Sequence, residues 1–462
     1  MKLRHPSLRF RFIRRPVLVI AICLAAVLAL LPGTAHAATR VASTAASRID
    51  SGDTAWVLLS AALVMLMTPA LGFFYGGLVR QKNALTTITH SFFMLCLISV
   101  QWVLWGYSLA FGPDHWHIIG GLDWALLRNV SFSQPDPFGY APTVPHQAFM
   151  MFQMMFAVIT PALITGAFAE RKRFKAYVLF SLLWATFIYD PLAHWTWGHD
   201  GWLNNMHLCD FAGGTVVEMS SGVSALVAAL VLGPRLGLGK EKMDPHNLMY
   251  VMLGAAFLWF GWFGFNAGSS LAAGGLATSA FVATNTAGAM AALTYLTVSW
   301  WHKGQPSAVG AAFGAVCGLV GITPAAGFVD VSGAIIIGLG AGFVGYFGVQ
   351  LKNVFGADDS LDVLACHGLT GTWGTIMTGV FATTAITGTA SKSGWIDGHW
   401  QQVFIQLTAV GATWLWCGVG TFIVLKVTNA IVGLRVDVTD ELLGLDLAQH
   451  GENAYALGDS AQ

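Results

Sequence analysis

The sequence predicts an all-α protein that crosses a membrane many times, and three observations support this prediction. Hydrophobic residues make up 55% of the 462 residues and charged residues only 10%, whereas soluble domains carry about 25% charged residues. Apolar runs of spanning length recur from residue 53 onward, separated by short polar stretches. The 53 glycines cluster inside these runs, which indicates close packing between membrane helices.

The first 37 residues have the pattern of a secretory signal peptide. Six basic residues precede an apolar core at 17–31, and an Ala-His-Ala tripeptide ending at Ala37 provides the cleavage site. Because the core is short for a membrane span, we expect cleavage; the alternative is an uncleaved first membrane helix. Residues 38–52 then form an external N-terminal segment.

Residues 53–432 form the predicted membrane domain. Eleven spans are expected in it, with approximate ranges of 53–79, 84–112, 147–168, 174–193, 211–233, 247–270, 277–301, 307–325, 329–351, 361–384 and 398–430. With the mature N-terminus outside, most basic residues fall in cytoplasmic loops, and the external loops hold only Arg128 and Lys392. The positive-inside rule therefore predicts an external N-terminus and a cytoplasmic C-terminal tail at 433–462.

Composition and motifs argue against several classes of function. Lys+Arg and Asp+Glu balance at 23 each, so there is no basic surplus with which to bind nucleic acid. The six cysteines form no CxxC motif, so neither a disulfide framework nor a zinc site is predicted. HExxH and GxSxG motifs are absent from the sequence, and we therefore expect no enzyme, metal site or cofactor.

The fifth predicted span carries a carboxylate deep inside it. In a helix that rises about 1.5 Å per residue, Glu218 lies roughly 12 Å beyond Asp210, near the centre of a hydrocarbon core about 30 Å thick. An ionisable side chain at that depth normally faces the interior of the bundle or a water-filled path. Asp210, followed by Gly213 and Gly214, is predicted to cap the helix rather than to contact a ligand.

The tenth predicted span supplies a partner for Glu218. It runs in the opposite direction, so His367 reaches the membrane centre from the cytoplasmic side, and each residue is followed four positions later by a glycine, Gly222 or Gly371. This recurrence in both halves predicts inverted five-helix repeats with a site at the midplane. Alternatively, His367 is a core histidine bonded to one carbonyl, and Glu218 is a carboxylic acid kept neutral by burial. Their presence on two opposing helices favours a conduction path.

Aromatic residues gather near the external ends of several spans. Trp195 and Trp197 end the fourth span, Phe156 lies in the third, and Trp259 to Phe265 crowd the sixth. Tryptophan at this level commonly anchors a helix at the membrane interface. An aromatic face can also attract a cation by about 0.5–2 kcal/mol, so recruitment of a cation is the alternative role.

Taken together, these segments resemble the Amt/Mep/Rh ammonium transporter family over about residues 53–455. The resemblance is carried by six segments in the family's order, at 72–80, 166–171, 210–217, 261–269, 362–371 and 451–455. It implies the ammonium transporter fold, a homotrimer with one pore in each subunit, and a place in the cytoplasmic (inner) membrane of a bacterium. It also implies ammonium as substrate, contact with membrane lipid, and a PII-type signal protein that binds at the cytoplasmic face.

The resemblance assigns roles to individual residues. Trp197, Ser269 and Phe156 match an external site that recruits ammonium, and Phe156 and Phe265 match a gate of stacked phenylalanines below it. The family's pore carries two facing histidines that relay a proton. His367 matches the second histidine, but Glu218 stands in the place of the first. We therefore expect Glu218 and His367 to share one proton and to act as the relay.

Three functions remain open within this resemblance. The first is ammonium transport with deprotonation, passage of ammonia through an apolar pore and a Glu218/His367 proton relay. The second is an ammonium sensor that uses the same fold as a receptor. The third is an Rh-like channel for a neutral gas, which a test of electrogenic transport would separate from the first.

Overall fold

The computed structural model describes residues 48–455, apart from the side chains of residues 353 and 355. The predicted signal peptide at 1–37 lies outside the described residues, as do the end of the tail at 456–462 and most of the external segment at 38–52. Within the described part the chain is mostly helical, which confirms the predicted fold class.

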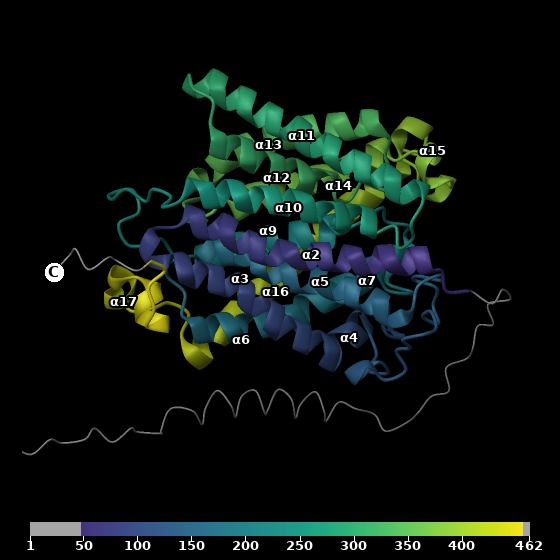
Figure 1. Cartoon of the computed structure of the whole chain (residues 1–462), viewed down its shortest axis with the longest axis horizontal. Coiled ribbons are helices and arrows are strands. Elements are labelled where there is room, and N and C mark those ends of the chain that lie inside the picture. Colours follow the sequence, from purple (N-terminus) through teal and green to yellow (C-terminus); the bar gives the residue numbers. More distant parts are fainter. Residues whose placement is uncertain (1–47, 456–462) are drawn as a thin grey trace, which may run out of the picture. The chain divides into compact units, whose positions relative to one another are not determined.

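Helices follow the predicted spans in order, and in the fifth and tenth spans a π-helical segment precedes the α-helix, which begins at residues 220 and 370. They are α2 (Ser51–Leu78), α3 (Ala84–Gln101), α4 (Tyr107–Phe111), α5 (His146–Ile164), α6 (Phe174–Trp184), α7 (Asp190–Trp197), α9 (Ser220–Leu232), α10 (Leu248–Gly268), α11 (Gly275–Lys303), α12 (Ala308–Ile322), α13 (Val331–Phe355), α14 (Thr370–Phe381) and α16 (Gln401–Val432). Figure 1 shows these helices running side by side in a bundle.

Shorter elements connect the long helices. They are the helices α8 (Trp202–Asn205), α15 (Thr384–Thr387) and α17 (Val438–Leu443), the strands β1 (Asp114–His115) and β2 (Ile119–Gly120), the 3₁₀ turns Gln81–Asn83, Ala125–Leu127, Thr165–Phe168, Ala390–Lys392 and Trp395–Asp397, and the π-helical segments Trp102–Gly106, Ala185–Tyr189, Gly214–Met219, Leu364–Leu369 and Asp446–His450. β1 and β2 pair antiparallel in the long loop after α4.

The number of membrane spans is only partly settled by helix length. Within residues 48–455, nine helical stretches are long and apolar enough to cross a membrane. α12 is a shorter apolar helix, and α14 continues the π-helical segment Leu364–Leu369. Helices thus stand at all the predicted positions, whereas the count of eleven spans, their orientation and the inverted repeat stay predictions.

Glycines let the helices approach closely, as the sequence predicts. A Cβ atom on Gly261 of α10 would lie 2.3 Å from Cγ of Met67 on α2. A Cβ atom on Gly338 of α13 would lie 2.5 Å from the carbonyl oxygen of Ala287 on α11. No side chain fits at these distances, so the structural role predicted for the glycines is confirmed.

Buried charges tie together the loops at the predicted cytoplasmic end. The guanidinium of Arg171 is fully buried and donates to the carbonyl oxygens of Ala167 and Gly233 at 2.9 Å and of Asp358 at 2.7 Å. Arg235 donates to both carboxylate oxygens of Asp358 at 2.9 Å. Burial alone would raise the pKa of Asp358, but the hydrogen bonds and charges of Arg235 and Arg171 outweigh burial and hold this pKa below its usual value.

The tail after α16 packs against the same end of the bundle. The carboxylate of Asp446 accepts hydrogen bonds from the backbone N–H groups of Leu85 at 3.0 Å and Thr86 at 2.7 Å, at the start of α3. The ammonium group of Lys82 donates to the carbonyl oxygens of Glu441 and Leu442 in α17. Figure 1 shows α17 at one end of the helices. The tail is therefore part of the folded unit through these contacts.

Candidate functional site

Glu218 and His367 both lie on wide π-helical turns. Glu218 belongs to the segment Gly214–Met219, which leads into α9, and His367 belongs to Leu364–Leu369, which leads into α14. A π-helical turn accommodates one more residue than an α-helical turn and is frequent at functional sites. The two segments contact each other, so both candidate residues stand where the regular helix is locally widened.

The structure brings the two side chains into direct contact. Nδ1 of His367 lies 2.6 Å from Oε2 of Glu218, and the two side chains are 4% and 1% exposed. This distance is that of a strong, charge-assisted hydrogen bond. Whether the pair is written as acid and imidazole or as carboxylate and imidazolium, one proton lies between the two atoms. The arrangement can therefore hold one proton shared between the two side chains.

Two glycines make this contact possible. A Cβ atom on Gly222 would lie 2.0 Å from the backbone nitrogen of Gly368 and 2.3 Å from its Cα. A Cβ atom on Gly371 would lie 2.9 Å from Cβ of Glu218. The two helices therefore touch backbone to backbone beside the pair, and only glycine fits at this crossing.

Asp210 organises the start of the segment that carries Glu218. One carboxylate oxygen accepts from the N–H groups of Gly213 at 2.8 Å and Gly214 at 2.6 Å, and the other accepts from the N–H of Thr215 at 2.8 Å and from its hydroxyl. Gly213 has a φ of 110°, in the left-handed region that favours glycine. The Asp210 side chain thus satisfies N–H groups that the helix leaves unpaired, which is the action of a cap.

An apolar inner cavity lies against the Glu218/His367 pair. It offers about 10 Å³ for the centres of water-sized molecules, which is room for roughly one such molecule. Apart from Glu218 and His367, the lining side chains are apolar or aromatic, namely Met67, Leu71, Phe74, Ile159, Leu163, Val217, Leu258, Trp262, Phe265 and Val316. The Nε1 atom of Trp262 donates to the hydroxyl of Thr323 at 2.9 Å and is not free for a molecule in the cavity.

Two phenylalanines separate this cavity from a larger outer pocket. The ring centroids of Phe156 and Phe265 are 4.4 Å apart, the rings are tilted by 40°, and each side chain is 1% exposed. Phe156 lines the outer pocket and Phe265 the inner cavity. The two contacting rings thus belong one to each lining.

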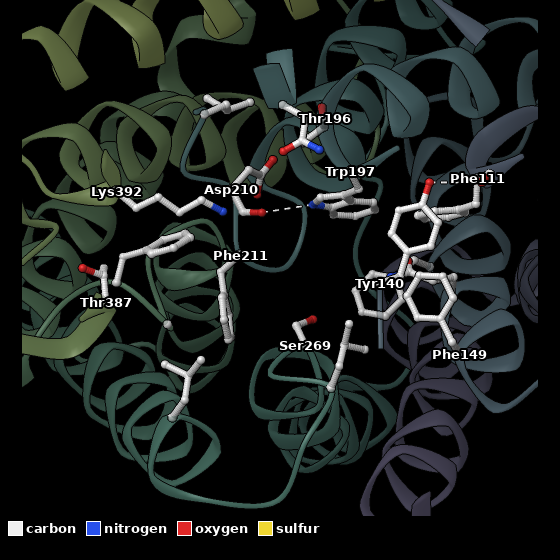
Figure 2. Close-up of a pocket in the computed structure, with 18 of the residues that line it drawn as sticks. Phe111, Tyr140, Phe149, Thr196, Trp197, Asp210, Phe211, Ser269, Thr387 and Lys392 are labelled. Atoms are coloured by element: carbon white, nitrogen blue, oxygen red, sulfur yellow. Dashed lines mark hydrogen bonds between the residues drawn. The ribbon is translucent and has the colours of Figure 1, made fainter. Parts of the chain in front are cut away.

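The outer pocket contains the other residues expected to recruit a cation. It has about 370 Å³ for the centres of water-sized molecules, and Figure 2 shows Trp197, Asp210 and Ser269 around it. The Nε1 atom of Trp197 donates to the carbonyl oxygen of Asp210 at 3.0 Å, which fixes the indole ring. The Ser269 hydroxyl donates to the carbonyl oxygen of Phe265 at 2.8 Å, so its oxygen remains able to accept from a ligand.

Sequence reasoning missed several residues of this pocket. Tyr140 reaches it from the long external loop, Gln153 from α5, and Lys392 from the loop between α14 and α16. No periodicity marks a loop residue as part of a pocket. Lys392 did carry one signal, because it is one of only two Lys or Arg residues in the predicted external loops.

The chain is similar to known proteins over most of its length. A family model described as Ammonium Transporter Family matches residues 55–455. The ammonium transporter of Bacillus subtilis (strain 168) is 50% identical over 408 residues, which cover 88% of this chain and 99% of that protein. The crystal structure of Saccharomyces cerevisiae Mep2 is 36% identical with a TM-score of 0.81, and the match covers 89% of this chain and 93% of that chain.

A further solved structure, described as a Sensor Amt Protein, is 28% identical with a TM-score of 0.79 and matches 86% of this chain and 98% of its own. The family model extends over residues 55–455, a range that contains Glu218, His367 and the outer pocket, and the Bacillus relative matches 88% of the chain. The chain therefore belongs to the ammonium transporter family.

Proposed function

We propose that ammonium is recruited in the outer pocket, loses its proton near the phenylalanine pair and crosses the inner cavity as ammonia, while Glu218 and His367 relay the proton. Ammonium transport itself follows from membership of the family. The observation that carries the proposed route is the 2.6 Å contact between Glu218 and His367 on the wall of an otherwise apolar cavity.

Recruitment follows from the aromatic and polar groups of the outer pocket. The ring centroids of Trp197 and Phe156 are 6.1 Å apart with the planes at 83°, so the two rings pack edge to face, and a cation in the pocket is attracted by a ring face rather than held between two faces. Each such contact contributes about 0.5–2 kcal/mol. The Ser269 oxygen adds a hydrogen-bond acceptor for an ammonium N–H. These groups can hold a small cation at the mouth but cannot replace its whole hydration shell.

The apolar wall of the inner cavity favours passage of the substrate as neutral ammonia rather than as ammonium. An ammonium ion there would lose most of its hydration with only Glu218 and His367 as polar partners, and burying an uncompensated charge costs many kcal/mol. Ammonia carries no net charge and loses far less. The proton then needs a separate path, and the Glu218/His367 pair is the group in this cavity that can exchange one.

Replacing Trp197 with alanine is expected to raise the KM for ammonium uptake roughly threefold to thirtyfold, because the mutant loses cation–π attraction in the outer pocket. The maximal rate should change much less, since the inner cavity and the Glu218/His367 pair are left intact. The measurement is ammonium uptake into proteoliposomes over a range of external concentrations.

The matched control for this experiment is Trp400→Ala. Trp400 lies at the start of α16, is 52% exposed, and lies outside the residues that line the outer pocket. Its replacement should leave the KM near the wild-type value. Equal KM values for Trp197→Ala and the wild type would contradict recruitment at this pocket.

A sensor is the second candidate, because the chain also resembles the Sensor Amt Protein structure. A sensor would bind ammonium in the outer pocket without sustained flux. Ammonium binding together with uptake no faster than that of empty liposomes would favour this candidate over transport.

Assembly and location are also parts of the proposal. A homotrimer in the inner membrane of a bacterium is supported by the resemblance and by large apolar side chains that α10 and α11 expose to lipid or to another subunit, such as Phe257, Phe260 and Phe281. Native mass spectrometry should give the mass of three chains. A monomer under every mild detergent condition would contradict the trimer.

Binding of a PII-type signal protein is proposed for the predicted cytoplasmic face. A shallow pocket of about 770 Å³ lies there between the loop after α9 and the tail, with Arg235, Lys240 and Glu441 in its lining. We expect a PII protein from the same cell to lower ammonium uptake by inside-out vesicles. Unchanged uptake at saturating PII would contradict this partner.

A further inference from the structure

The outer pocket already contains a cation that belongs to the chain. Lys392 ends the 3₁₀ turn Ala390–Lys392 in the loop between α14 and α16, and it lines the same pocket as Trp197 and Ser269. Figure 2 shows its side chain extended into the pocket, with the amino nitrogen directed toward Asp210. A primary ammonium group is thus presented where the proposed function places the substrate.

Among residues 48–455, no carboxylate forms an ion pair with this cation. In the part of the chain that the structure describes, none of the ion pairs includes Lys392. The carboxylate of Asp397, in the same loop, accepts from the N–H of Thr384 at 2.6 Å and from its hydroxyl at 2.9 Å. The carboxylate of Asp210 is already occupied by Gly213, Gly214 and Thr215. The positive charge of Lys392 is therefore left facing the pocket.

An aromatic ring holds the amino group at the pocket wall. Nζ of Lys392 lies 5.9 Å from the ring centroid of Phe328, which in turn packs edge-on against Phe211 with the centroids 5.6 Å apart. Phe211 and Phe328 both line the pocket. The distance of 5.9 Å is within the range of a weak cation–π attraction. The ammonium group of Lys392 therefore makes a cation–π contact in the pocket. This is the same kind of contact that the pocket offers to a free ammonium ion.

We infer that Lys392 is a tethered competitor of ammonium and sets the affinity of the outer pocket. This inference rests on the proposed function of that pocket. Two like charges in one pocket oppose each other, and the aromatic faces and the field of Asp210 that attract ammonium also attract the lysine head group. Lys392 thus lowers the occupancy of the pocket at a given ammonium concentration and shifts the working range of the transporter upward.

The test compares Lys392→Gln with the wild type in proteoliposomes. Removing the charge is expected to lower the KM for ammonium uptake roughly threefold to tenfold, the effect of a unit charge several ångströms away in a partly hydrated pocket. Lys392→Met, a second neutral variant, should lower the KM by a similar factor. Lys392→Arg keeps the charge and should restore a KM within about twofold of the wild type.

The dependence on salt separates an electrostatic role from a packing role. Dissolved salt screens charges at a partly exposed site, so the difference in KM between wild type and Lys392→Gln should shrink as ionic strength rises. A packing defect would not depend on salt in this way. The matched control is Arg128→Gln, because Arg128 is an exposed cation of another external loop and does not line the pocket. Its KM should stay at the wild-type value.

Three outcomes would overturn the inference while leaving ammonium transport intact. They are equal KM values for wild type and both neutral variants, an equal fall in KM for Lys392→Arg and Lys392→Gln, and an equal fall for Arg128→Gln. Failure of the proposed function has a different signature: either the wild type itself would move no ammonium, or Trp197→Ala would take up ammonium with an unaltered KM.

Discussion

Replacing Glu218 with alanine is expected to reduce the ammonium-evoked current in proteoliposomes by about a hundredfold or more. A positioned group that transfers a proton contributes factors of this size, and the 2.6 Å contact with His367 is the only proton-sharing contact between two side chains on the wall of the inner cavity. Without Glu218, His367 loses the carboxyl group with which it shares a proton, and the charge-coupled route is interrupted.

Two further variants separate proton transfer from hydrogen bonding. Glu218→Gln can still bond to His367 but cannot ionise, so its current should fall nearly as far as that of Glu218→Ala. Glu218→His restores a group that exchanges protons, and it should retain current with an altered dependence on pH because two imidazoles replace the acid and imidazole pair. Normal current with an unchanged pH dependence in Glu218→Ala would contradict the relay.

Replacing Gly222 with alanine is expected to destabilise the protein and to abolish transport. The new Cβ would lie 2.0 Å from the nitrogen and 2.3 Å from the Cα of Gly368. Both atoms are backbone, so α9 must move away from the turn that carries His367. Overpacking of this kind costs about 1–3 kcal/mol, and the shift separates Glu218 from His367. Thermal unfolding in detergent and uptake in liposomes measure the two effects.

The matched control for this substitution is Gly411→Ala. Gly411 lies inside α16, and a Cβ atom there would meet no other atom within 4 Å. Alanine should therefore keep transport and leave stability equal or higher by about 0.5–1 kcal/mol, because glycine is unfavourable inside a helix. A Gly222→Ala protein as stable and active as Gly411→Ala would show that the close crossing of α9 is not required.

Much of the fold and of the site could be read from the sequence, because burial in a membrane leaves a strong pattern. Apolar runs gave the positions of the helices, and two titratable residues stood out against them. Opposite chain directions then predicted that Glu218 and His367 approach each other, and the structure brings them together. Hydropathy gives the positions of the helices, and the position of a residue along its helix gives its depth in the membrane, so neither step requires knowledge of side-chain packing.

Other features depend on packing and left little trace in the sequence. A π-helical turn shifts the helical periodicity by one residue, but the residues on either side of Glu218 are all small or apolar and show no period in which the shift could be seen. The backbone contact of Gly222 with Gly368 follows from the crossing of two helices, which residue spacing does not determine. Lys392 enters the outer pocket only because its loop folds back over it, and a loop has no periodicity from which to predict this.

The most direct test of the central claim is to record current and ammonium uptake together in proteoliposomes of the unaltered protein. If ammonium is deprotonated and its proton relayed by Glu218 and His367, each ammonium taken up should carry one positive charge across the membrane, and the current should reverse with the ammonium gradient. Uptake at the same rate with no accompanying current would contradict this account and would show that the protein is a channel for neutral ammonia.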